Sequence, residues 1–324
     1  MCTALTYHTK DYYFGRNLDI EYSFNEKVII TPRNFPFEFR CVKNISRHYA
    51  IIGIGIIENE YPLYYDATNE KGLSMAGLNF PDNAFYKAQV ESFDNITPFE
   101  FIPWILGQCA TVTEAEKLLT RINLVDINFS ENLPLSPLHW IIADREKSIV
   151  VEPCRDGLKI HQNPVGVLTN NPVFEYHMIN LNNYINLTAE APVNRFSDKV
   201  ELKSYSRGMG ALGLPGDLSS ASRFIRCTFC KLNSLSGNSE AESVSQFFHI
   251  LGSVEQQRGC VHINDDKFEM TLYSSCCNVD RGLYYYRTYD NSQISCVDIN
   301  KENLDGKNLI AYPLIEGQRI KYQN

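Results

Sequence analysis

The sequence predicts an α+β fold, in which β-sheets are covered by helices within one layered domain spanning residues 1–324. Two observations support this prediction. Short runs rich in Ile, Val, Leu and Tyr fill the first eighty residues and return after residue 268, as strands do. Between them lie segments whose apolar residues keep helical spacing behind capping signals.

The N-terminal strands are predicted at residues 3–8 and 12–18, which form a hairpin turning near Lys10-Asp11. Gly and Asn separate the runs that follow. These further strands are expected at residues 28–31, 49–57, 63–66 and 73–78.

Helices are predicted next. Thr97 and Glu100 form a capping-box pattern with Pro98 at the first helical position, which favours a helix to about residue 109. Thr113 and Glu116 repeat the pattern and predict a helix to about residue 121. Further helices are expected at 175–184, at 219–235 and at 240–255, the last capped by Ser239. Strands are expected at 138–143, 148–152, 159–161, 165–168, 268–276, 282–289 and 293–299.

Residues 186–218 carry Pro, Gly and Ser without a clear period, which predicts a long irregular excursion. Long loops of this kind in compact domains often serve function or contact partners. We therefore expect a possible oligomer contact in this segment.

Composition excludes several classes of function. The chain is 44% hydrophobic with a net charge of -8 and has no Lys/Arg-rich block, so neither nucleic acid nor an anionic membrane surface is an expected partner. The longest apolar run, residues 50–57, is too short to span a bilayer, and the N-terminus lacks a signal-peptide pattern. We expect a cytoplasmic protein whose ten scattered cysteines are free thiols.

Cys2 is the residue that suggests chemistry. Removal of Met1 would give Cys2 a free α-amino group beside its own thiol. An α-amine has a reference pKa of about 7.7–8.0 and a free cysteine thiol one of about 8.5, so the amine can accept the thiol proton near neutral pH. One residue would then supply both nucleophile and base.

Arg16 and Asp19 lie on the second strand of the predicted hairpin, where pairing brings them beside Cys2. The charge of Arg16 would favour the thiolate, and Asp19 would orient the α-ammonium. An Arg and an Asp on a strand are otherwise ordinary surface charges.

The order of motifs along the chain resembles the choloylglycine hydrolases, the family of bile salt hydrolases and penicillin V acylases. The resemblance begins with Met1-Cys2-Thr3 and Phe14-Gly15-Arg16-Asn17-Leu18-Asp19 and covers most of the chain. The other matching motifs are residues 28–34, 69–73, 76–80, 138–140, 148–152, 166–172, 214–217, 222–224 and 247–251. The resemblance is greatest to the bile salt hydrolases of Gram-positive gut bacteria.

This resemblance implies the N-terminal nucleophile hydrolase sandwich, with two antiparallel sheets between helical layers. It implies hydrolysis of glycine- or taurine-conjugated bile salts through a thioester on Cys2, with no cofactor and no metal, by a homotetramer. The residues that match the family's catalytic positions are Cys2, Arg16, Asp19, Asn79, Asn170 and Arg223. Asn79 and Asn170 match the contributors to the oxyanion hole, and Asn at position 79 favours bile salts over penicillin V.

Two alternatives stay open: a penicillin V acylase of the same family, and a non-catalytic steroid-binding protein. The pattern Gly208-Met209-Gly210-Ala211-Leu212-Gly213 lacks the preceding strand and following helix of a dinucleotide site, and Cys227-Thr228-Phe229-Cys230 lacks a second pair for zinc. The loops at residues 22–27, 59–63 and 126–135 are candidates for the wall of a steroid pocket.

Overall fold

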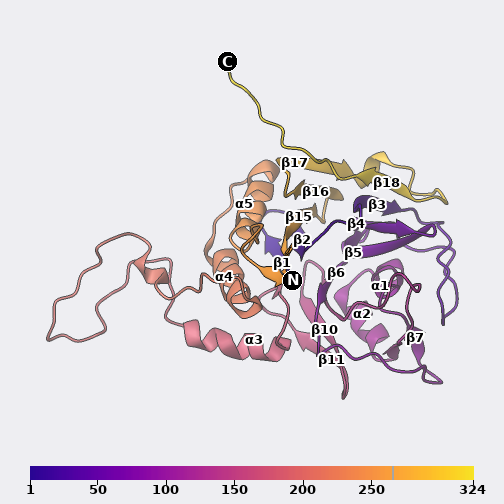
Figure 1. The fold of residues 1–324 in the computed structure, drawn as a ribbon, viewed down its shortest axis with the longest axis horizontal. Coiled ribbons are helices and arrows are strands. Elements are labelled where there is room, and N and C mark those ends of the chain that lie inside the picture. The colour runs from indigo at the N-terminus through magenta and orange to yellow at the C-terminus, as the bar shows by residue number, and fades with distance from the viewer. Residues whose placement is uncertain (265) are drawn as a thin grey trace.

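Two antiparallel sheets pack face to face in the computed structural model, which describes residues 1–264 and 266–324 (Figure 1). The six-stranded sheet has the order β12-β1-β2-β15-β16-β17. Its strands are β1 Cys2–His8, β2 Tyr12–Ile20, β12 Val167–Leu168, β15 Met270–Asn278, β16 Leu283–Thr288 and β17 Asn291–Asp298.

The eight-stranded sheet has the order β11-β10-β9-β6-β5-β4-β3-β18. Its strands are β3 Lys27–Thr31, β4 Ile51–Glu58, β5 Tyr61–Asn69, β6 Ser74–Asn79, β9 Leu138–Ala143, β10 Ser148–Cys154, β11 Gly157–Gln162 and β18 Ile310–Pro313. Two small ribbons pair β7 Asp94–Ile96 with β8 Ile122–Leu124, and β13 His262–Asn264 with β14 Lys267–Phe268.

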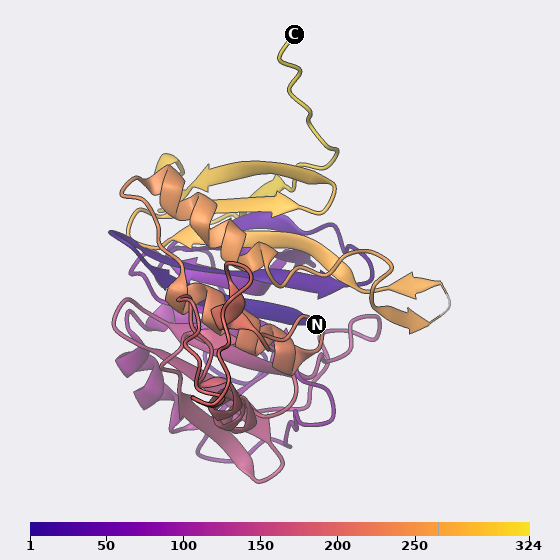
Figure 2. The same ribbon diagram turned by 90° about the vertical axis from the view of Figure 1, so that its left-hand side faces the viewer.

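Helices cover both outer faces (Figures 1 and 2). The helices α4 Ser220–Asn233 and α5 Glu240–Gly252 pack on the six-stranded sheet, whereas α1 Phe101–Gln108 packs on the eight-stranded sheet with α2 Val112–Leu119 in the same apolar cluster. The short helix α3 Phe174–Asn180 lies against α4. The predicted sandwich of helix, sheet, sheet and helix is confirmed.

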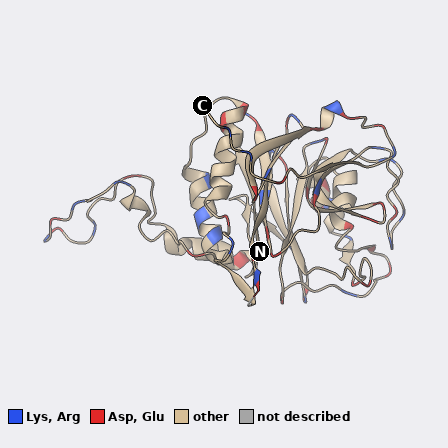
Figure 3. Cartoon of the chain, turned by 45° about the horizontal axis from the view of Figure 1, so that its top comes forward, with Lys and Arg blue, Asp and Glu red and all other residues tan. Residues whose placement is uncertain are grey.

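The pleat of each strand divides the core in two. On β4, Ile52 and Ile54 point toward the six-stranded sheet, while Ile51 points toward α1. Strands buried on both faces need continuous apolar runs, which explains the uninterrupted Ile-rich sequence of this segment. Most charged residues lie in the loops and helices around the two sheets (Figure 3), whereas Arg16, Asp66 and Arg223 are buried.

The predicted capping box at Thr97 and Glu100 is wrong, because α1 begins only at Phe101. Residues 97–100 form a turn in which the Glu100 carboxylate accepts the Thr97 N–H at 3.2 Å. Pro103 explains the shift: it fits the first turn of a helix that starts at Phe101, but would break a helix that started at Pro98.

The predicted cap of the second helix is displaced by two residues. Thr111, not Thr113, caps α2 and accepts the Glu114 N–H at 3.2 Å. The sequence holds two overlapping Thr-x-x-Glu patterns, and the structure uses the one that buries Val112 and Ala115. The capping box of α5 at Ser239 and Glu242 is confirmed. The β18 strand, which pairs with β3, was not predicted.

The excursion at residues 186–218 projects away from the two sheets (Figure 1) and contains the 3₁₀ turn Met209–Ala211. Among the described residues, no helix combines the length and apolar character needed to cross a membrane.

Gly15 allows β2 and β15 to approach closely, since a β-carbon there would lie 2.0 Å from the Ser275 carbonyl oxygen. We expect Gly15→Ala to lower the free energy of unfolding by about 1–3 kcal/mol, as overpacking does, because β15 must move. Chemical denaturation measures this, with Gly216→Ala as the control, since no atom lies within 4 Å of that β-carbon. Equal stability of the two variants would contradict the close approach.

Candidate active site

Cys2 is the first residue of β1, pairs with Leu18 of β2 and lines a cavity of about 410 Å³. The side chain is buried, with 4% exposure. Because side chains alternate along a strand, Cys2 and Arg16 share the face toward the eight-stranded sheet, while Thr3, Asn17 and Asp19 share the face toward α4 and α5. Charged side chains therefore lie near Cys2 on both faces of the six-stranded sheet.

Arg16 is fully buried between the two sheets. Its Nη1 donates to the carbonyl oxygens of Gly77 at 2.6 Å and Tyr65 at 2.9 Å, which fixes the guanidinium beside the cavity. Burial acts to lower the pKa of Arg16, but the negative charges of Cys2 and Asp66 outweigh it, so the pKa is raised. The guanidinium therefore remains charged next to the thiol.

Asp66 of β5 lies near Arg16 and anchors residues that contact it. Its buried carboxylate accepts hydrogen bonds from the hydroxyls of Tyr273 at 2.8 Å, Ser275 at 3.1 Å and Tyr284. Ser275 in turn accepts the Arg16 N–H at 3.1 Å. The Asp66 carboxylate, on the eight-stranded sheet, is therefore hydrogen-bonded to three residues of the six-stranded sheet.

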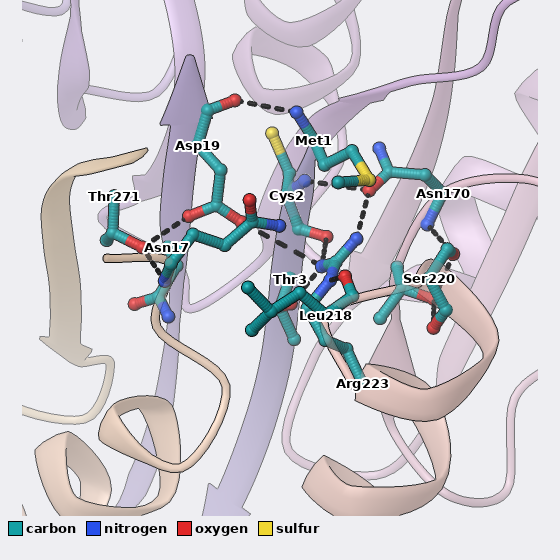
Figure 4. Close-up of polar contacts among 12 residues, drawn as sticks. Met1, Cys2, Thr3, Asn17, Asp19, Asn170, Leu218, Ser220, Arg223 and Thr271 are labelled. Atoms are coloured by element: carbon teal, nitrogen blue, oxygen red, sulfur yellow. Dashed lines mark hydrogen bonds and ion pairs between the residues drawn. The ribbon is translucent and has the colours of Figure 1, made fainter. Parts of the chain in front are cut away.

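Asp19 lies on the opposite face of β2 (Figure 4). Its Oδ1 accepts a hydrogen bond from the Thr271 hydroxyl at 2.6 Å, and its Oδ2 lies 3.8 Å from Arg223 Nη1. Burial raises the pKa of the Asp19 carboxyl, while the charge of Arg223 opposes that shift. Thr271 faces Asp19 because the two residues pair across β15 and β2.

Arg223 reaches Cys2 from α4. Its Nη1 donates to the Cys2 carbonyl oxygen and to the Thr3 hydroxyl, both at 2.6 Å, and its Nη2 donates to Asn170 Oδ1 at 2.8 Å. The Arg223 guanidinium is fully buried, and its bonds fix the first two residues of β1 as well as bringing a positive charge to the site.

Asn170 holds the nitrogen of Cys2: its Oδ1 accepts the Cys2 N–H at 2.7 Å (Figure 4). Its Nδ2 donates to the Asn79 carbonyl oxygen at 2.7 Å. Ser220 Oγ accepts the Asn170 N–H at 2.8 Å, and His177 Nε2 bonds the Asn170 carbonyl at 2.8 Å. Burial lowers the pKa of His177 to about 4, so the neutral ring donates at neutral pH.

Asn79 ends β6 at the cavity, and its side chain is exposed there. The structure therefore brings together all six sequence-predicted residues, Cys2, Arg16, Asp19, Asn79, Asn170 and Arg223. Asn79 is joined to the others through its backbone carbonyl.

The Met1 residue extends the hairpin by one pair. Its ammonium donates to the Asp19 carbonyl oxygen at 2.7 Å and forms an ion pair with Glu269, while its carbonyl accepts the Asp19 N–H at 3.0 Å. Burial lowers the pKa of the Met1 amino group, and the nearby Cys2 and Asp19 act in the opposite direction. Met1 and Glu269 both line the cavity.

Apolar side chains form most of the cavity wall. Each loop proposed from the sequence contributes: Phe24 from the first, Leu63 from the second, and Phe129 and Leu135 from the third. Further apolar lining comes from β2, β4, β5, β9, β13 and the start of α1. These residues include Leu18, Ile20, Ile56, Tyr65, Leu138, Trp140, Ile263, Phe99 and Ile102.

Other sequence motifs take no part in this site. Cys227 and Cys230 lie on α4, and burial raises the pKa of Cys227 to about 12. All ten cysteines are free. Within the described ranges, no cluster of three or more His, Cys, Asp or Glu side chains is arranged to hold a metal ion.

Sequence reasoning missed Thr271, Ser220, His177, Asp66 and Glu269. These residues come from separate elements, and nothing in their local sequence distinguishes them. Only the register of β15 against β2, or the docking of α3 and α4, places them.

Comparison with known proteins agrees with this geometry. Residues 2–312 match the model of the linear amide C–N hydrolases of the choloylglycine hydrolase family. A bile salt hydrolase/transferase of Lactiplantibacillus plantarum is 62% identical over 314 residues, which cover 97% of each chain. A bile salt hydrolase/transferase of Clostridium perfringens is 42% identical over 334 residues and 100% of each chain.

Solved structures agree as well. A Cys-to-Ala variant of the conjugated bile acid hydrolase from Clostridium perfringens superposes with a TM-score of 0.91 at 40% identity, over 100% of both chains. A penicillin V acylase from Agrobacterium tumefaciens gives a TM-score of 0.75 at 18% identity, over 97% of this chain and 92% of that one, which shows a shared fold. The chain therefore belongs to the choloylglycine hydrolase family of linear amide C–N hydrolases, enzymes with the N-terminal nucleophile fold.

Proposed function

We propose that this enzyme hydrolyses the amide bond between a bile acid and glycine or taurine. The observation that supports it most directly is that Cys2 and Arg16 line a cavity of about 410 Å³ whose wall is mostly apolar. A steroid needs a large apolar wall, and its polar tail needs a polar end. Two relatives named bile salt hydrolase/transferase align with 97% and 100% of the chain.

Removal of Met1 first matures the enzyme, because it frees the α-amine of Cys2. That amine takes the thiol proton, and Sγ attacks the amide carbonyl carbon. The amine then gives the proton to the leaving nitrogen, and water activated by the same amine hydrolyses the thioester. Asn170 Oδ1 holds the Cys2 nitrogen at 2.7 Å. We assign stabilisation of the thiolate to Arg16 and orientation of the amine to Asp19.

The oxyanion formed on attack requires preorganised donors. The side-chain amide of Asn170 has two N–H groups, and one of them is used by the Asn79 carbonyl. We assign the second to the oxyanion, together with a donor from Asn79. Asn170 then has two roles. Its Oδ1 accepts a hydrogen bond from the Cys2 amine, and its Nδ2 donates one to the oxyanion of the substrate.

We further propose that residues 1–324 act as one catalytic domain in the cytoplasm. The binding-protein alternative is set aside by membership of a hydrolase family. The penicillin V acylase alternative keeps the same nucleophile and differs only in the acyl group that the cavity accepts.

Rates on glycocholate, taurocholate and penicillin V distinguish a bile salt hydrolase from a penicillin V acylase. We expect a higher kcat/KM on at least one conjugated bile salt than on penicillin V, because the lining of the cavity is mostly apolar. The reverse order would establish the acylase alternative.

Substitution of Asn170 tests the oxyanion assignment. We expect Asn170→Ala to lower kcat by about 10²–10³, the usual cost of one lost oxyanion donor. The matched control is Asn182→Ala, an exposed amide that bonds only the Ile179 carbonyl among described residues. A kcat for Asn170→Ala close to that of the control would remove Asn170 from the mechanism.

The excursion at residues 186–218 suggests a homotetramer. It exposes apolar side chains that a monomer would leave in water: Val193 at 70%, Phe196 at 84%, Tyr205 at 85% and Leu212 at 75%. We expect sedimentation equilibrium to give the mass of four chains, and the double variant Phe196→Glu with Tyr205→Glu to dissociate. A monomeric parent enzyme would refute the assembly.

A further inference from the structure

His139 of β9 is a buried histidine next to the residues to which we assign the oxyanion. It follows Leu138, which pairs with Asn79 of β6, and its side chain is fully buried. Leu138 and Trp140 line the cavity, whereas the alternation along β9 directs His139 to the other face, toward the six-stranded sheet. The imidazole is therefore directed into the protein rather than into the cavity.

A hydrogen bond from His139 holds the chain immediately before Asn170. The Nε2 atom of His139 lies 2.9 Å from the carbonyl oxygen of Thr169. A carbonyl oxygen only accepts hydrogen bonds, so Nε2 carries a hydrogen and donates it. Because this carbonyl belongs to the peptide group that joins Thr169 to Asn170, the bond restricts the rotation of that group.

The backbone of Asn170 is held on its other sides as well. Its N–H, in the same peptide group, donates to Ser220 Oγ at 2.8 Å (Figure 4). Its carbonyl accepts a hydrogen bond from His177 Nε2 at 2.8 Å. Three consecutive backbone groups are therefore each bonded to a side chain, and Asn170 cannot shift without breaking one of these bonds.

The second contact of His139 is with the neighbour of Asn79. Its ring stacks on the ring of Phe80, with 4.2 Å between the centroids and 5° between the planes. Phe80 is fully buried, and its N–H donates to the Pro137 carbonyl at 2.7 Å. One imidazole therefore contacts the residue after Asn79 and also the residue before Asn170.

Glu152 of β10 connects the two histidines. Its Oε1 lies 3.2 Å from His139 Nδ1, and it accepts the N–H of Phe174, the first residue of α3, at 2.9 Å. The same helix carries His177. Burial of the Glu152 carboxylate is costly unless its hydrogen bonds compensate. The bonds that offset this cost are the ones that fix the His139 ring and the start of α3.

We propose that His139 is a positioning residue for the oxyanion hole. Its hydrogen bond to Thr169 fixes Asn170, and its stacking on Phe80 fixes Asn79, so that both donors stay in place for the developing charge. The inference rests on the proposed function, which assigns the oxyanion to these two asparagines. His139 touches no reacting atom, and its effect is on geometry: a misplacement of about 1 Å in such a site can cost about 10² in rate.

Two substitutions of His139 separate its hydrogen bond from its bulk. The side-chain amide nitrogen of glutamine reaches the place of Nε2, whereas that of asparagine reaches only the place of Nδ1. His139→Gln therefore keeps a donor for the Thr169 carbonyl, and His139→Asn removes it.

His48→Asn is the matched control. His48 is also buried, its Nε2 lies 3.0 Å from the Phe35 carbonyl oxygen, and its ring lies 4.6 Å from that of Phe37. It packs against Gly107 of α1, on the outer face of the eight-stranded sheet, whereas His139 is on the inner face. The control therefore removes a comparable buried hydrogen bond away from the two asparagines.

The experiment measures kcat and KM of the mature enzymes on a conjugated bile salt. It also measures the rate at which iodoacetamide alkylates Cys2, followed by mass spectrometry of the N-terminal peptide. Alkylation needs the nucleophile but no oxyanion donor. All rates are taken below the melting temperature of every variant.

We expect His139→Asn to lower kcat by about 10-fold to 10²-fold while KM and the alkylation rate stay at the parent values. His139→Gln should restore most of kcat, and His48→Asn should leave kcat unchanged. An equal kcat for His139→Asn and His48→Asn would overturn the proposal. A parallel loss of kcat and alkylation would overturn it too, because it would show general damage to the site.

Phe80→Leu is a second test, and it applies also if His139→Asn does not fold. It keeps apolar bulk but removes the stacking on His139, and its control is Phe37→Leu, which removes the ring beside His48. We expect a lower kcat at unchanged KM for Phe80→Leu alone. Equal kcat values in the two variants would refute the positioning role, whereas absence of hydrolysis in the parent enzyme would overturn the proposed function itself.

Discussion

The register of the β1–β2 hairpin is the constraint on which the site depends. Cys2 opposite Leu18 places Arg16 on one face of the six-stranded sheet and Asp19 on the other. A slip of one residue would exchange these faces and separate the guanidinium from the thiol. The hydrogen bond from the Cys2 nitrogen to Asn170 Oδ1 at 2.7 Å then fixes the chain end, which would otherwise fray.

Burying so many charges beside the nucleophile is costly, and the fold offsets the cost with partners. The Arg16 guanidinium donates to three carbonyl oxygens, and Asp66 accepts from three hydroxyls. Arg223 donates to Cys2, Thr3 and Asn170. These contacts join both sheets and α4 around one residue. The same rigidity preorganises the site, since neither the amine nor the guanidinium has to be reoriented when substrate arrives.

Much of this arrangement could be predicted from the sequence. Two strand-like runs joined near Lys10-Asp11 predicted the hairpin, and the pairing of its strands predicted Arg16 and Asp19 beside Cys2. The family motifs supplied Asn79, Asn170 and Arg223, which no local pattern identifies. Capping patterns gave the wrong helix start at Thr97 and at Thr113. Pro103 decides the start of the first helix, and two capping patterns overlap at the second. Glu269, Asp66 and Thr271 could not be predicted, because only the packing of distant strands brings them to the site.

The central claim is that one residue supplies both the sulfur and the nitrogen of catalysis. It is tested most directly on enzyme carrying a removable N-terminal extension that ends immediately before Cys2. Intact mass and the deconjugation rate are measured before and after the extension is cleaved. The account predicts negligible turnover while the Cys2 nitrogen is in an amide, and full turnover once it is free. Equal rates in the two forms would contradict it.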